Sequence, residues 1–358
     1  MNVMDLDFYQ GKRVFVTGHT GFKGSWLCRV LVNAGAEVTG YSLPAPTEPN
    51  LFSLSGLVGQ MTSVTGDIRD LPALKAAYAA ANPEIVLHLA AQPIVRTSYE
   101  QPVYTYETNV MGTVNLLECV RTSREPVKSV VVITTDKVYE NREWVWGYRE
   151  NEPLDGYDPY SNSKSCAELA VHSYVNSFFK NSSTAVSTAR AGNVIGGGDF
   201  ARDRIIPDCV RAAQEGQPVI VRNPYSTRPY QHVLEPIFAY LMIARRQYEN
   251  PDLAGWYNVG PDDCDCVTTG DLVELFCQAW GDGMSWENHA EENAPHEAAF
   301  LKLDSTKIKT TFGWQPRWHI REAVEKTVEW SKARMTEKSI PEVMDRQVAA
   351  FLQEGKYA

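Results

Sequence analysis

Short apolar runs alternate with helix-forming segments through the first 190 residues of the chain. One of these runs, 127–132, is rich in β-branched valine, which is typical of a strand buried in a parallel sheet. The pattern predicts strands at 13–17, 36–41, 61–65, 84–89, 127–134 and 184–190, and helices near 22–34, 70–81, 99–123 and 160–180. Because strands and helices alternate, we predict an α/β fold with a Rossmann-type, doubly wound parallel sheet.

The pattern becomes less regular after residue 190. It predicts short strands at 218–222 and 256–259, and helices at 234–247, 270–280, 304–312, 319–335 and 340–353. We infer that the chain leaves the first lobe and later crosses back into it. The predicted division is a large lobe of residues 1–190 plus about 232–262, and a smaller, discontinuous C-terminal lobe of about 191–231 and 263–358.

The composition narrows the function classes. The chain has 358 residues and a net charge of −10, and an acidic surface argues against non-specific binding of nucleic acid. No apolar stretch reaches the ~18 residues of a membrane span, and the acidic first ten residues do not resemble a signal peptide. The seven cysteines are scattered, and Cys264 and Cys266 are too close for ordinary metal spacing. We expect a cytoplasmic protein with reduced thiols and no metal site.

A glycine-rich loop follows the first predicted strand and opens the first predicted helix. Its sequence is Gly18-His-Thr-Gly-Phe-Lys-Gly24, a G-x-x-G-x-x-G pattern. Such a loop lets the backbone approach a pyrophosphate at the helix N-terminus, although a simple glycine turn would have the same composition. The residues predicted to contact a dinucleotide here are Gly18, Thr20, Gly21, Phe22 and Gly24.

The candidate catalytic residues lie after the fifth predicted strand and on the helix that follows. Tyr160 and Lys164 are spaced one helical turn apart on the same face. A nearby ammonium favours phenolate, so Tyr160 could act as a base well below its free pKa of about 10. Thr135 could bond a substrate hydroxyl, and Asp136 and Lys137 add a second acid–base pair. This set suits an enzyme that oxidises an alcohol and then eliminates water, whereas an ordinary surface helix is the alternative explanation for Tyr160 and Lys164.

These motifs together resemble the extended short-chain dehydrogenase/reductase family, and within it the nucleotide-sugar 4,6-dehydratases. The resemblance covers the chain from Arg13 to about Trp314. It is strongest to the branch that acts on CDP-glucose, in the stretches Gly18–Leu27, Gly40–Phe52, Thr134–Tyr139 and Arg228–Pro236. The resemblance implies a CDP-glucose substrate, a homodimer or dimer of dimers, and a place in deoxysugar biosynthesis for surface polysaccharides such as the O-antigen of lipopolysaccharide.

The resemblance also implies roles for single residues. The implied cofactor contacts beyond the glycine loop are Asp67, Ile68, Leu89, Ala90, Ala91 and Thr108, together with Tyr160 and Lys164. The implied or candidate substrate contacts are Gln92, Arg96, Asn193, Arg204, Arg222 and Arg228. Asp67 could instead cap the helix that begins near residue 70. Asn109 matches a helix asparagine that supports the active-site backbone.

Two features depart from the family pattern. The second predicted strand ends in Gly40-Tyr-Ser42, which has neither an acid for a ribose 2′-hydroxyl nor an arginine for a 2′-phosphate. The residues therefore do not decide between NAD and NADP, and NAD is expected from the family. Lys137 stands where many dehydratases have glutamate as the base. Three alternatives stay open: a dehydratase for UDP-N-acetylglucosamine or dTDP-glucose, a 4-epimerase, and a non-catalytic dinucleotide-sensing protein.

Overall fold

The computed structural model describes residues 5–290, 299–336 and 338–353. Its centre is a seven-stranded sheet in which all neighbouring strands run parallel, in the order β11-β6-β5-β4-β1-β2-β3. The strands are β1 (Arg13–Thr17), β2 (Glu37–Ser42), β3 (Thr62–Thr65), β4 (Ile85–His88), β5 (Ser129–Thr135), β6 (Ala185–Ala191) and β11 (Trp256–Val259). The prediction of a doubly wound α/β fold is confirmed.

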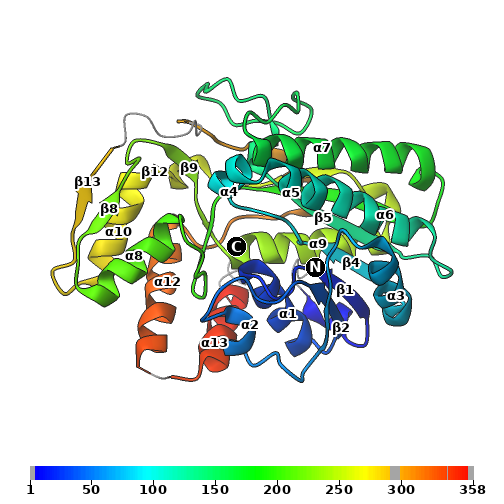
Figure 1. Ribbon diagram of the computed structural model, residues 1–358, viewed down its shortest axis with the longest axis horizontal. Helices are drawn as coiled ribbons and strands as arrows, with labels where there is room; N and C mark the ends of the chain where they lie inside the picture. Colours follow the sequence, from blue (N-terminus) through cyan, green and yellow to red (C-terminus); the bar gives the residue numbers. More distant parts are fainter. Residues whose placement is uncertain (1–4, 291–298, 337, 354–358) are drawn as a thin grey trace.

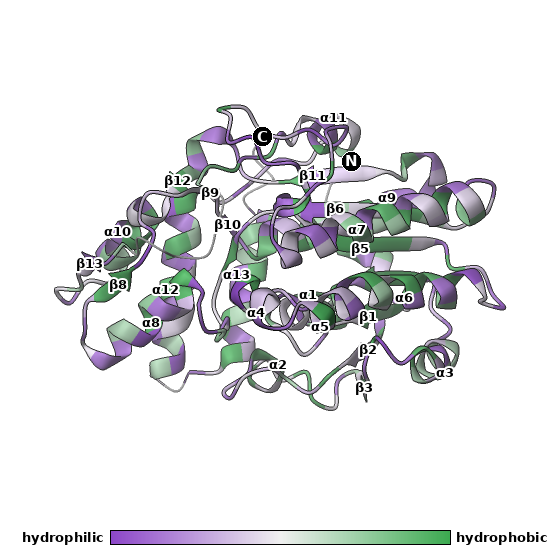
Figure 2. Cartoon of the chain, turned by 45° about the horizontal axis from the view of Figure 1, so that its top comes forward, coloured by the Kyte–Doolittle hydropathy of each residue, from purple (hydrophilic) through white to green (hydrophobic). Residues whose placement is uncertain are grey.

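Helices cover both faces of this sheet (Figure 1). One face packs against α1 (Phe22–Asn33), α9 (Leu234–Glu249) and α13 (Ile340–Gln353). The other face packs against α3 (Leu71–Ala81), α6 (Gly112–Arg121) and α7 (Pro159–Tyr174). The central strand β5 is buried along its whole length, and Figure 2 shows its hydrophobic colouring between the helices. Strands buried on both faces need such continuous apolar runs.

A second group of elements lies beyond the carboxyl ends of the strands, on the left of Figure 1. Its core is formed by apolar side chains of α8 (Ile205–Glu215), α10 (Thr269–Trp280) and α12 (Ile320–Met335). Short strand pairs complete it, namely β7 (Val194–Ile195) with β10 (Gln231–His232), β8 (Val219–Val221) with β13 (Trp286–Asn288), and β9 (Thr227–Pro229) with β12 (Cys266–Thr268). The chain then returns to the large sheet, where α13 packs beside α1 and α9.

The single helix predicted over 99–123 is divided in the structure. It consists of α4 (Val95–Glu100), α5 (Pro102–Tyr106), a π-helical turn (Glu107–Met111) and α6. Pro102 lacks the N–H that a continuous helix needs, so it begins a new helix instead. The helix predicted over 160–180 begins at Pro159 and ends in a second π-helical turn, Val175–Phe179. The remaining described helices are α2 (Leu51–Leu54), α11 (Thr306–Phe312) and short 3₁₀ turns at Leu6–Tyr9, Asp136–Val138, Pro251–Leu253 and Asp263–Asp265.

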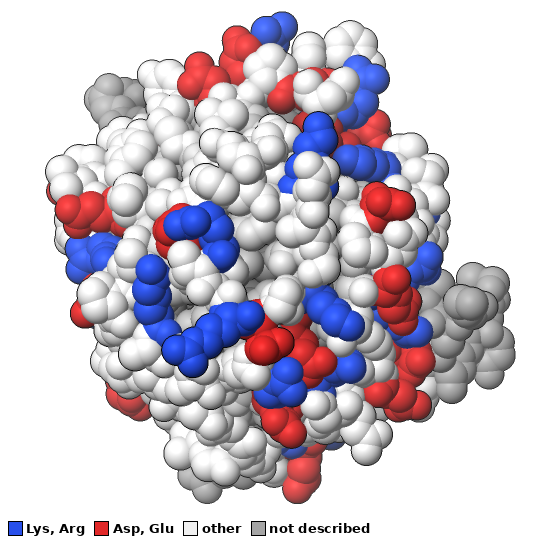
Figure 3. Space-filling view, turned by 90° about the vertical axis from the view of Figure 1, so that its right-hand side faces the viewer, with Lys and Arg blue, Asp and Glu red and all other residues white. Residues whose placement is uncertain are grey.

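None of the helices in the described part of the chain has the length and apolar character needed to cross a lipid bilayer. On the face that Figure 3 presents, lysine and arginine side chains lie among aspartate and glutamate side chains.

Candidate active site

A cavity of about 540 Å³ opens at the carboxyl ends of the central strands, between the sheet and the second group of elements. Ligands of open α/β sheets bind at this edge. Four of the five predicted catalytic residues, five of the six predicted substrate contacts and one further predicted cofactor contact line it, namely Thr135, Asp136, Lys137, Tyr160, Arg96, Asn193, Arg204, Arg222, Arg228 and Phe22. The structure therefore brings together residues that are separated by up to two hundred positions in the sequence.

Helix α7 carries Tyr160, which lines the cavity, and Lys164, which lies one turn further along the helix behind the cavity wall. Its first turn is fixed by Pro159 at the start and by the Asp158 side chain, which accepts a hydrogen bond from the Ser161 N–H. Tyr160 lies close to Thr135 at the end of β5, and a hydrogen bond links the two side chains. The ammonium of Lys164 donates to the backbone oxygen of Ile133 at 3.3 Å. Both side chains are buried.

Burial shifts the pKa values of both Tyr160 and Lys164. It raises the pKa of Tyr160 to about 12, although the hydrogen bond from Thr135 lowers that pKa. Burial also lowers the pKa of Lys164 to about 7, assisted by the charge of Lys23 and opposed by Glu168. The sequence predicts that Tyr160 can act as a base well below its free pKa of about 10, whereas in the structure its pKa is raised, because desolvation outweighs the contacts that lower it.

Asp136 and Lys137 form the second predicted pair, in the 3₁₀ turn that follows β5. Oδ1 of Asp136 accepts a hydrogen bond from Thr135 Oγ1 at 2.9 Å and lies 3.4 Å from Nζ of Lys137. The other carboxylate oxygen, Oδ2, is buried and has no hydrogen-bond partner among the described residues. Nζ of Lys137 also donates to Oδ1 of Asn193 at 3.1 Å. An acid and an amine thus share one wall of the cavity.

The glycine loop forms a cradle without side chains. Gly18 has a positive φ of 78°, and a Cβ there would lie 2.8 Å from the backbone nitrogen of Ala90. A Cβ on Gly24 would lie 2.1 Å from the Gly18 oxygen, so the loop and helix can meet this closely only without it. Gly21 begins α1 without any side-chain cap, which leaves the first-turn N–H groups directed at the loop. Such a helix start suits an anionic pyrophosphate.

The residues predicted to hold the rest of a dinucleotide lie around this loop. The N–H groups of Leu89 and Ala90 each donate to Thr17 Oγ1 at 3.2 Å, which fixes the backbone after β4. Ala91 follows them, half-buried. Thr108 is buried in the π-helical turn, and its hydroxyl has no hydrogen-bond partner in the described structure. Ile68 is buried, and its side chain contacts the Gly112 position.

Asp67 is not a helix cap. Asp70 caps α3, because its side chain accepts from the Ala73 N–H. The carboxylate of Asp67 instead bonds Arg69, at 2.8 Å to Nη2 and 2.9 Å to the backbone nitrogen, and these contacts lower the pKa of Asp67. The alternative interpretation of Asp67 as a cap is therefore wrong, and the residue keeps an ionised carboxylate.

Among the predicted substrate contacts, Gln92 differs from the others. Its Nε2 donates to Thr105 Oγ1 at 2.9 Å, and its Oε1 accepts from the Ile94 N–H at 2.6 Å. The side chain is buried and does not line the cavity. Its backbone is held by Asn109, which accepts from the Gln92 N–H and donates to the Gln92 oxygen and to Ser163. The side chain of Gln92 therefore bonds neighbouring parts of the protein and does not face the cavity.

The arginines lie on the opposite wall. Arg204 is paired with Asp199 at 2.9 Å, and Arg222 with Asp203 at 3.2 Å. Arg228 is 2% exposed and donates to the backbone oxygen of Thr227. Guanidinium groups on a cavity wall suit bidentate binding of a diphosphate.

Sequence reasoning missed Lys23. It occupies a variable position of the glycine loop, yet its side chain lines the cavity beside the catalytic candidates. Burial and the charge of Arg204 lower its pKa to about 8, while Asp136 acts in the opposite direction. A cation within a loop otherwise made of small and aromatic residues was the signal available in the sequence.

A group of possible metal ligands lies outside the cavity. Ligand atoms of Cys264, Asp265 and His319 lie within 4.8 Å of one another, although the cysteine spacing predicts no metal site. Asp265 already accepts hydrogen bonds from the Ile320 N–H at 2.9 Å and from His319 Nδ1 at 2.8 Å. Its carboxylate therefore has a structural use at the start of α12.

Comparison with known proteins decides the family. The model of the GDP-mannose 4,6 dehydratase family matches residues 15–327. This chain belongs to that family. It is 54% identical over 337 residues to the CDP-glucose 4,6-dehydratase of Salmonella typhimurium, covering 92% of this chain and 93% of the relative. It is 28% identical to the dTDP-glucose 4,6-dehydratase of Streptomyces antibioticus, covering 88% of this chain and 91% of the relative.

A solved structure shares the fold of this GDP-mannose 4,6 dehydratase family member. It is the Thermus thermophilus UDP-glucose 4-epimerase in complex with NAD, with a TM-score of 0.78 and 25% identity. The match covers 89% of this chain and 98% of the epimerase. The resemblance to the extended dehydrogenase/reductase family and its dehydratase branch is thus confirmed.

Proposed function

We propose that this chain is a CDP-glucose 4,6-dehydratase, which converts CDP-D-glucose to CDP-4-keto-6-deoxy-D-glucose and water. The observation that carries the proposal is the 54% identity to the Salmonella typhimurium enzyme over nearly the whole of both chains. The cavity supports it, because its wall holds Thr135 and Tyr160 of the alcohol-oxidising set together with the acid–amine pair Asp136 and Lys137.

The cofactor in this proposal is NAD. The glycine loop, the uncapped start of α1 and the unpartnered hydroxyl of Thr108 fit a dinucleotide, and the epimerase of the same fold was solved with NAD. When bound, NAD accepts a hydride from C4 of the sugar and returns it to C6. The residues that would hold it are those of the glycine loop with Asp67, Ile68, Leu89, Ala90, Ala91, Thr108, Tyr160 and Lys164.

The oxidation at C4 uses Thr135, Tyr160 and Lys164. Tyr160 takes the proton of the 4-hydroxyl, and Thr135, already bonded to Tyr160, orients that hydroxyl. Lys164 in its charged form favours the phenolate. Burial raises the pKa of Tyr160 to about 12 even with Thr135 beside it, so this step needs the positive charge of Lys164.

The elimination uses Asp136 and Lys137. The 4-keto group acidifies the proton on C5, and Lys137 in its neutral form removes it. The 6-hydroxyl then leaves as water with a proton given by Asp136. A double bond between C5 and C6 forms. After hydride return to C6, Lys137, whose ammonium protons exchange with solvent, gives a proton to C5, and the proton that Tyr160 took from the 4-hydroxyl passes on to restore Asp136. The contact between Asp136 and Lys137 allows the pair to exchange the proton that makes one an acid and the other a base.

The substrate in this proposal lies across both lobes. Asn193 and the arginines Arg96, Arg204, Arg222 and Arg228 take the nucleotide and diphosphate. The nucleotide-sugar lobe is the predicted one, about 191–231 and 263–358, except that α11 and α13 pack on the large sheet and so join the NAD lobe. We expect a homodimer through α5 and α7, supported by exposed apolar side chains there: Val103 is 69% exposed and Leu169 is 52% exposed. Leu169→Arg should then give a monomer in sedimentation, whereas an unchanged assembly would contradict this interface.

We also place the enzyme in the cytoplasm, where its product would supply deoxysugars for surface polysaccharides such as O-antigen. The seven free cysteines in the described residues support the cytoplasmic location.

A substrate panel tests the proposed function. The chain with NAD is incubated with CDP-glucose, UDP-glucose, UDP-N-acetylglucosamine or dTDP-glucose, and loss of one water is followed by mass. Preferred water loss from CDP-glucose supports the proposal. Preferred water loss from another nucleotide sugar would identify a dehydratase for that sugar instead. Inversion at C4 without water loss would identify a 4-epimerase. No reaction with any of the sugars would favour a dinucleotide-sensing protein.

A further inference from the structure

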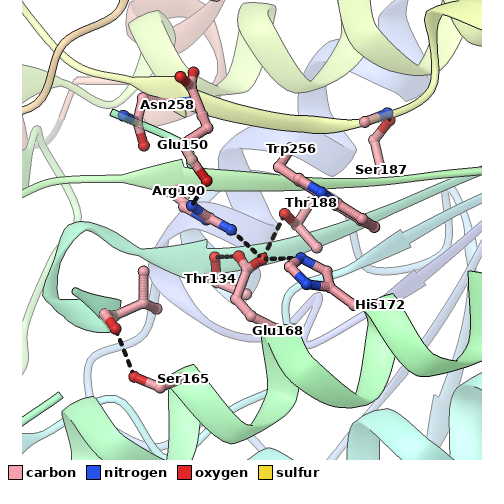
Figure 4. A network of polar contacts seen from close by, with 12 residues as sticks. Thr134, Glu150, Ser165, Glu168, His172, Ser187, Thr188, Arg190, Trp256 and Asn258 are labelled. Atoms are coloured by element: carbon pink, nitrogen blue, oxygen red, sulfur yellow. Dashed lines mark hydrogen bonds and ion pairs between the residues drawn. The ribbon is translucent and has the colours of Figure 1, made fainter. Parts of the chain in front are cut away.

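A buried charged pair lies behind the cavity, between the catalytic helix α7 and strands β5 and β6. Glu168 of α7 and Arg190 of β6 are both 0% exposed in their side chains and lie 2.9 Å apart (Figure 4). Neither lines the cavity. Burying two charges costs several kcal/mol per ion, and apolar residues of the same volume often give equal or greater stability. The pair therefore calls for an explanation beyond stability.

The contacts of Glu168 join three elements that carry the active site. Its Oε1 accepts from Thr134 Oγ1 at 2.5 Å, and its Oε2 accepts from Thr188 Oγ1 at 2.8 Å and from Arg190. Thr134 directly precedes Thr135 on β5. Glu168 itself lies one helical turn after Lys164 on α7. A single carboxylate thus ties α7, which carries Tyr160 and Lys164, to the strand end beside Thr135; Figure 4 shows the bond between Glu168 and Thr134.

Arg190 extends the network to the neighbouring segments. Its Nη1 donates to the Tyr139 hydroxyl at 2.9 Å and to the backbone oxygen of Glu150 at 3.1 Å. Tyr139 in turn donates to Asn258 Oδ1 of β11 at 2.6 Å. The guanidinium is therefore fixed from several sides and holds the Glu168 carboxylate in one place.

We propose that Glu168, held by Arg190, is a positioning residue for the C4 oxidation, setting Lys164 and Tyr160 against Thr135 and sustaining the charge of Lys164. This rests on the proposed function, since it assigns the oxidation to those three residues. The charged and titratable groups facing Lys164 are Glu168 and Tyr160 on its own helix, Lys23 on α1 and His88 on β4. Glu168 is the carboxylate in this set, and it raises the pKa of Lys164 against burial and Lys23.

The experiment compares three variants in single turnovers with NAD and CDP-glucose, following cofactor reduction and water loss separately. Thr134→Val removes the bond from β5 to Glu168 and should slow cofactor reduction by about tenfold to a hundredfold, the scale of a misplaced reacting group. Thr188→Val removes a similar buried hydroxyl bond from a residue that does not adjoin a catalytic one, and should leave the reduction rate within about threefold. Equal rates for both threonine variants would overturn the inference.

Glu168→Gln separates charge from position. Without the carboxylate the pKa of Lys164 falls further, so cofactor reduction should decline at a lower pH than in the parent, while Thr134→Val should keep the parent pH profile. A Glu168→Gln profile that is merely scaled down would show a structural role alone and overturn the inference. If Glu168→Gln does not fold, Glu168→Gln/Arg190→Met replaces it, because no unpaired charge is then buried, and the same shift is required.

The two proposals fail in different ways. Parent enzyme that ignores CDP-glucose but reduces NAD with another nucleotide sugar overturns the proposed substrate, and the variants are then read with that sugar. Parent enzyme that processes CDP-glucose while the Thr134 and Glu168 variants match it in rate and pH profile overturns only the inference.

Discussion

Two pairs of opposite charge lie at the carboxyl end of the sheet, and they are held in different ways. Asp136 and Lys137 line the cavity 3.4 Å apart, and one oxygen of Asp136 has no hydrogen-bond partner in the described chain. Glu168 and Arg190 lie behind the cavity at 2.9 Å, with both carboxylate oxygens bonded. A pair that must exchange protons with a substrate needs a polar atom that is still able to bond the substrate. A pair that only sets geometry needs no such atom.

The difference also explains where each pair sits. Protons can reach Asp136 and Lys137 from a bound sugar, because both residues line the cavity. Glu168 is fully buried, and its contacts hold its pKa low, near about 2, so it stays ionised across the working range. One pair is arranged for proton transfer and the other for fixed geometry, although the end of β5 connects them: Asp136 and Lys137 follow this strand, and Glu168 bonds its residue Thr134.

The largest expected effect comes from replacing Tyr160, the proposed base of the C4 oxidation. Tyr160→Phe should lower turnover by about 10⁴-fold, the upper range for one acid–base group, because the phenol proposed to take the 4-hydroxyl proton is removed. Binding of the nucleotide sugar, measured by calorimetry, should change little, since the ring is kept. Activity within tenfold of the parent would remove Tyr160 from the mechanism.

Lys137→Ala tests the cavity pair. Oxidation should continue, but without a base at C5 elimination should slow by about 10²- to 10⁴-fold. In heavy water the parent should place deuterium at C5, and the variant should give an oxidised, undehydrated sugar without it. Lys137→Glu, the residue of many dehydratases, should restore part of the elimination. Deuterium entering C5 at the parent rate in Lys137→Ala would show that another group is the base.

Arg190→Met tests the buried pair through stability instead of activity. Removing one partner leaves the Glu168 carboxylate buried without its counter-charge, which costs about 3–5 kcal/mol of unfolding free energy. The double variant Glu168→Gln/Arg190→Met should recover most of that loss, because neither charge remains. Denaturant unfolding of the three proteins checks this, and a double variant no more stable than Arg190→Met would mean that the bonds around the pair, and not its charges, hold the fold.

The sequence predicted the sheet well because buried parallel strands leave a direct signature. The valine run of β5 and the glycine loop after β1 place the strand ends, and with them Thr135, Asp136 and Lys137. Strand-end position gives the edge of the sheet but not the direction of a side chain. Gln92 shows this, since it follows β4 as a substrate contact should, yet its amide bonds Thr105 instead.

The remaining features depend on contacts that no local pattern records. The break at Pro102 follows from a missing N–H, but the π-helical turn that places Thr108 and Asn109 has no comparable marker. Glu168 meets residues of β5 and β6 that lie 20 to 34 positions away in the sequence. In the sequence, Glu168 resembles a solvated residue on a helix surface. Only the fold shows that its hydrogen-bond partners surround it.

Acid titration gives the smallest expected effect and sharpens the contrast between the pairs. The folded pKa of Glu168 lies below its usual value of 4.5, at about 2, chiefly because Arg190 and the surrounding hydrogen bonds outweigh burial. A group with a depressed folded pKa contributes stability that is present above its unfolded pKa and is lost as the pH falls towards the folded value. Thermal midpoints of the parent should therefore fall more steeply between about pH 5 and pH 2 than those of Glu168→Gln/Arg190→Met. His88 and His232, whose pKa values burial lowers to about 3, destabilise both proteins alike in acid and so cancel in the difference. Parallel curves for the two proteins would mean that Glu168 gains no net stabilisation from being ionised, and that its charge serves Lys164 alone.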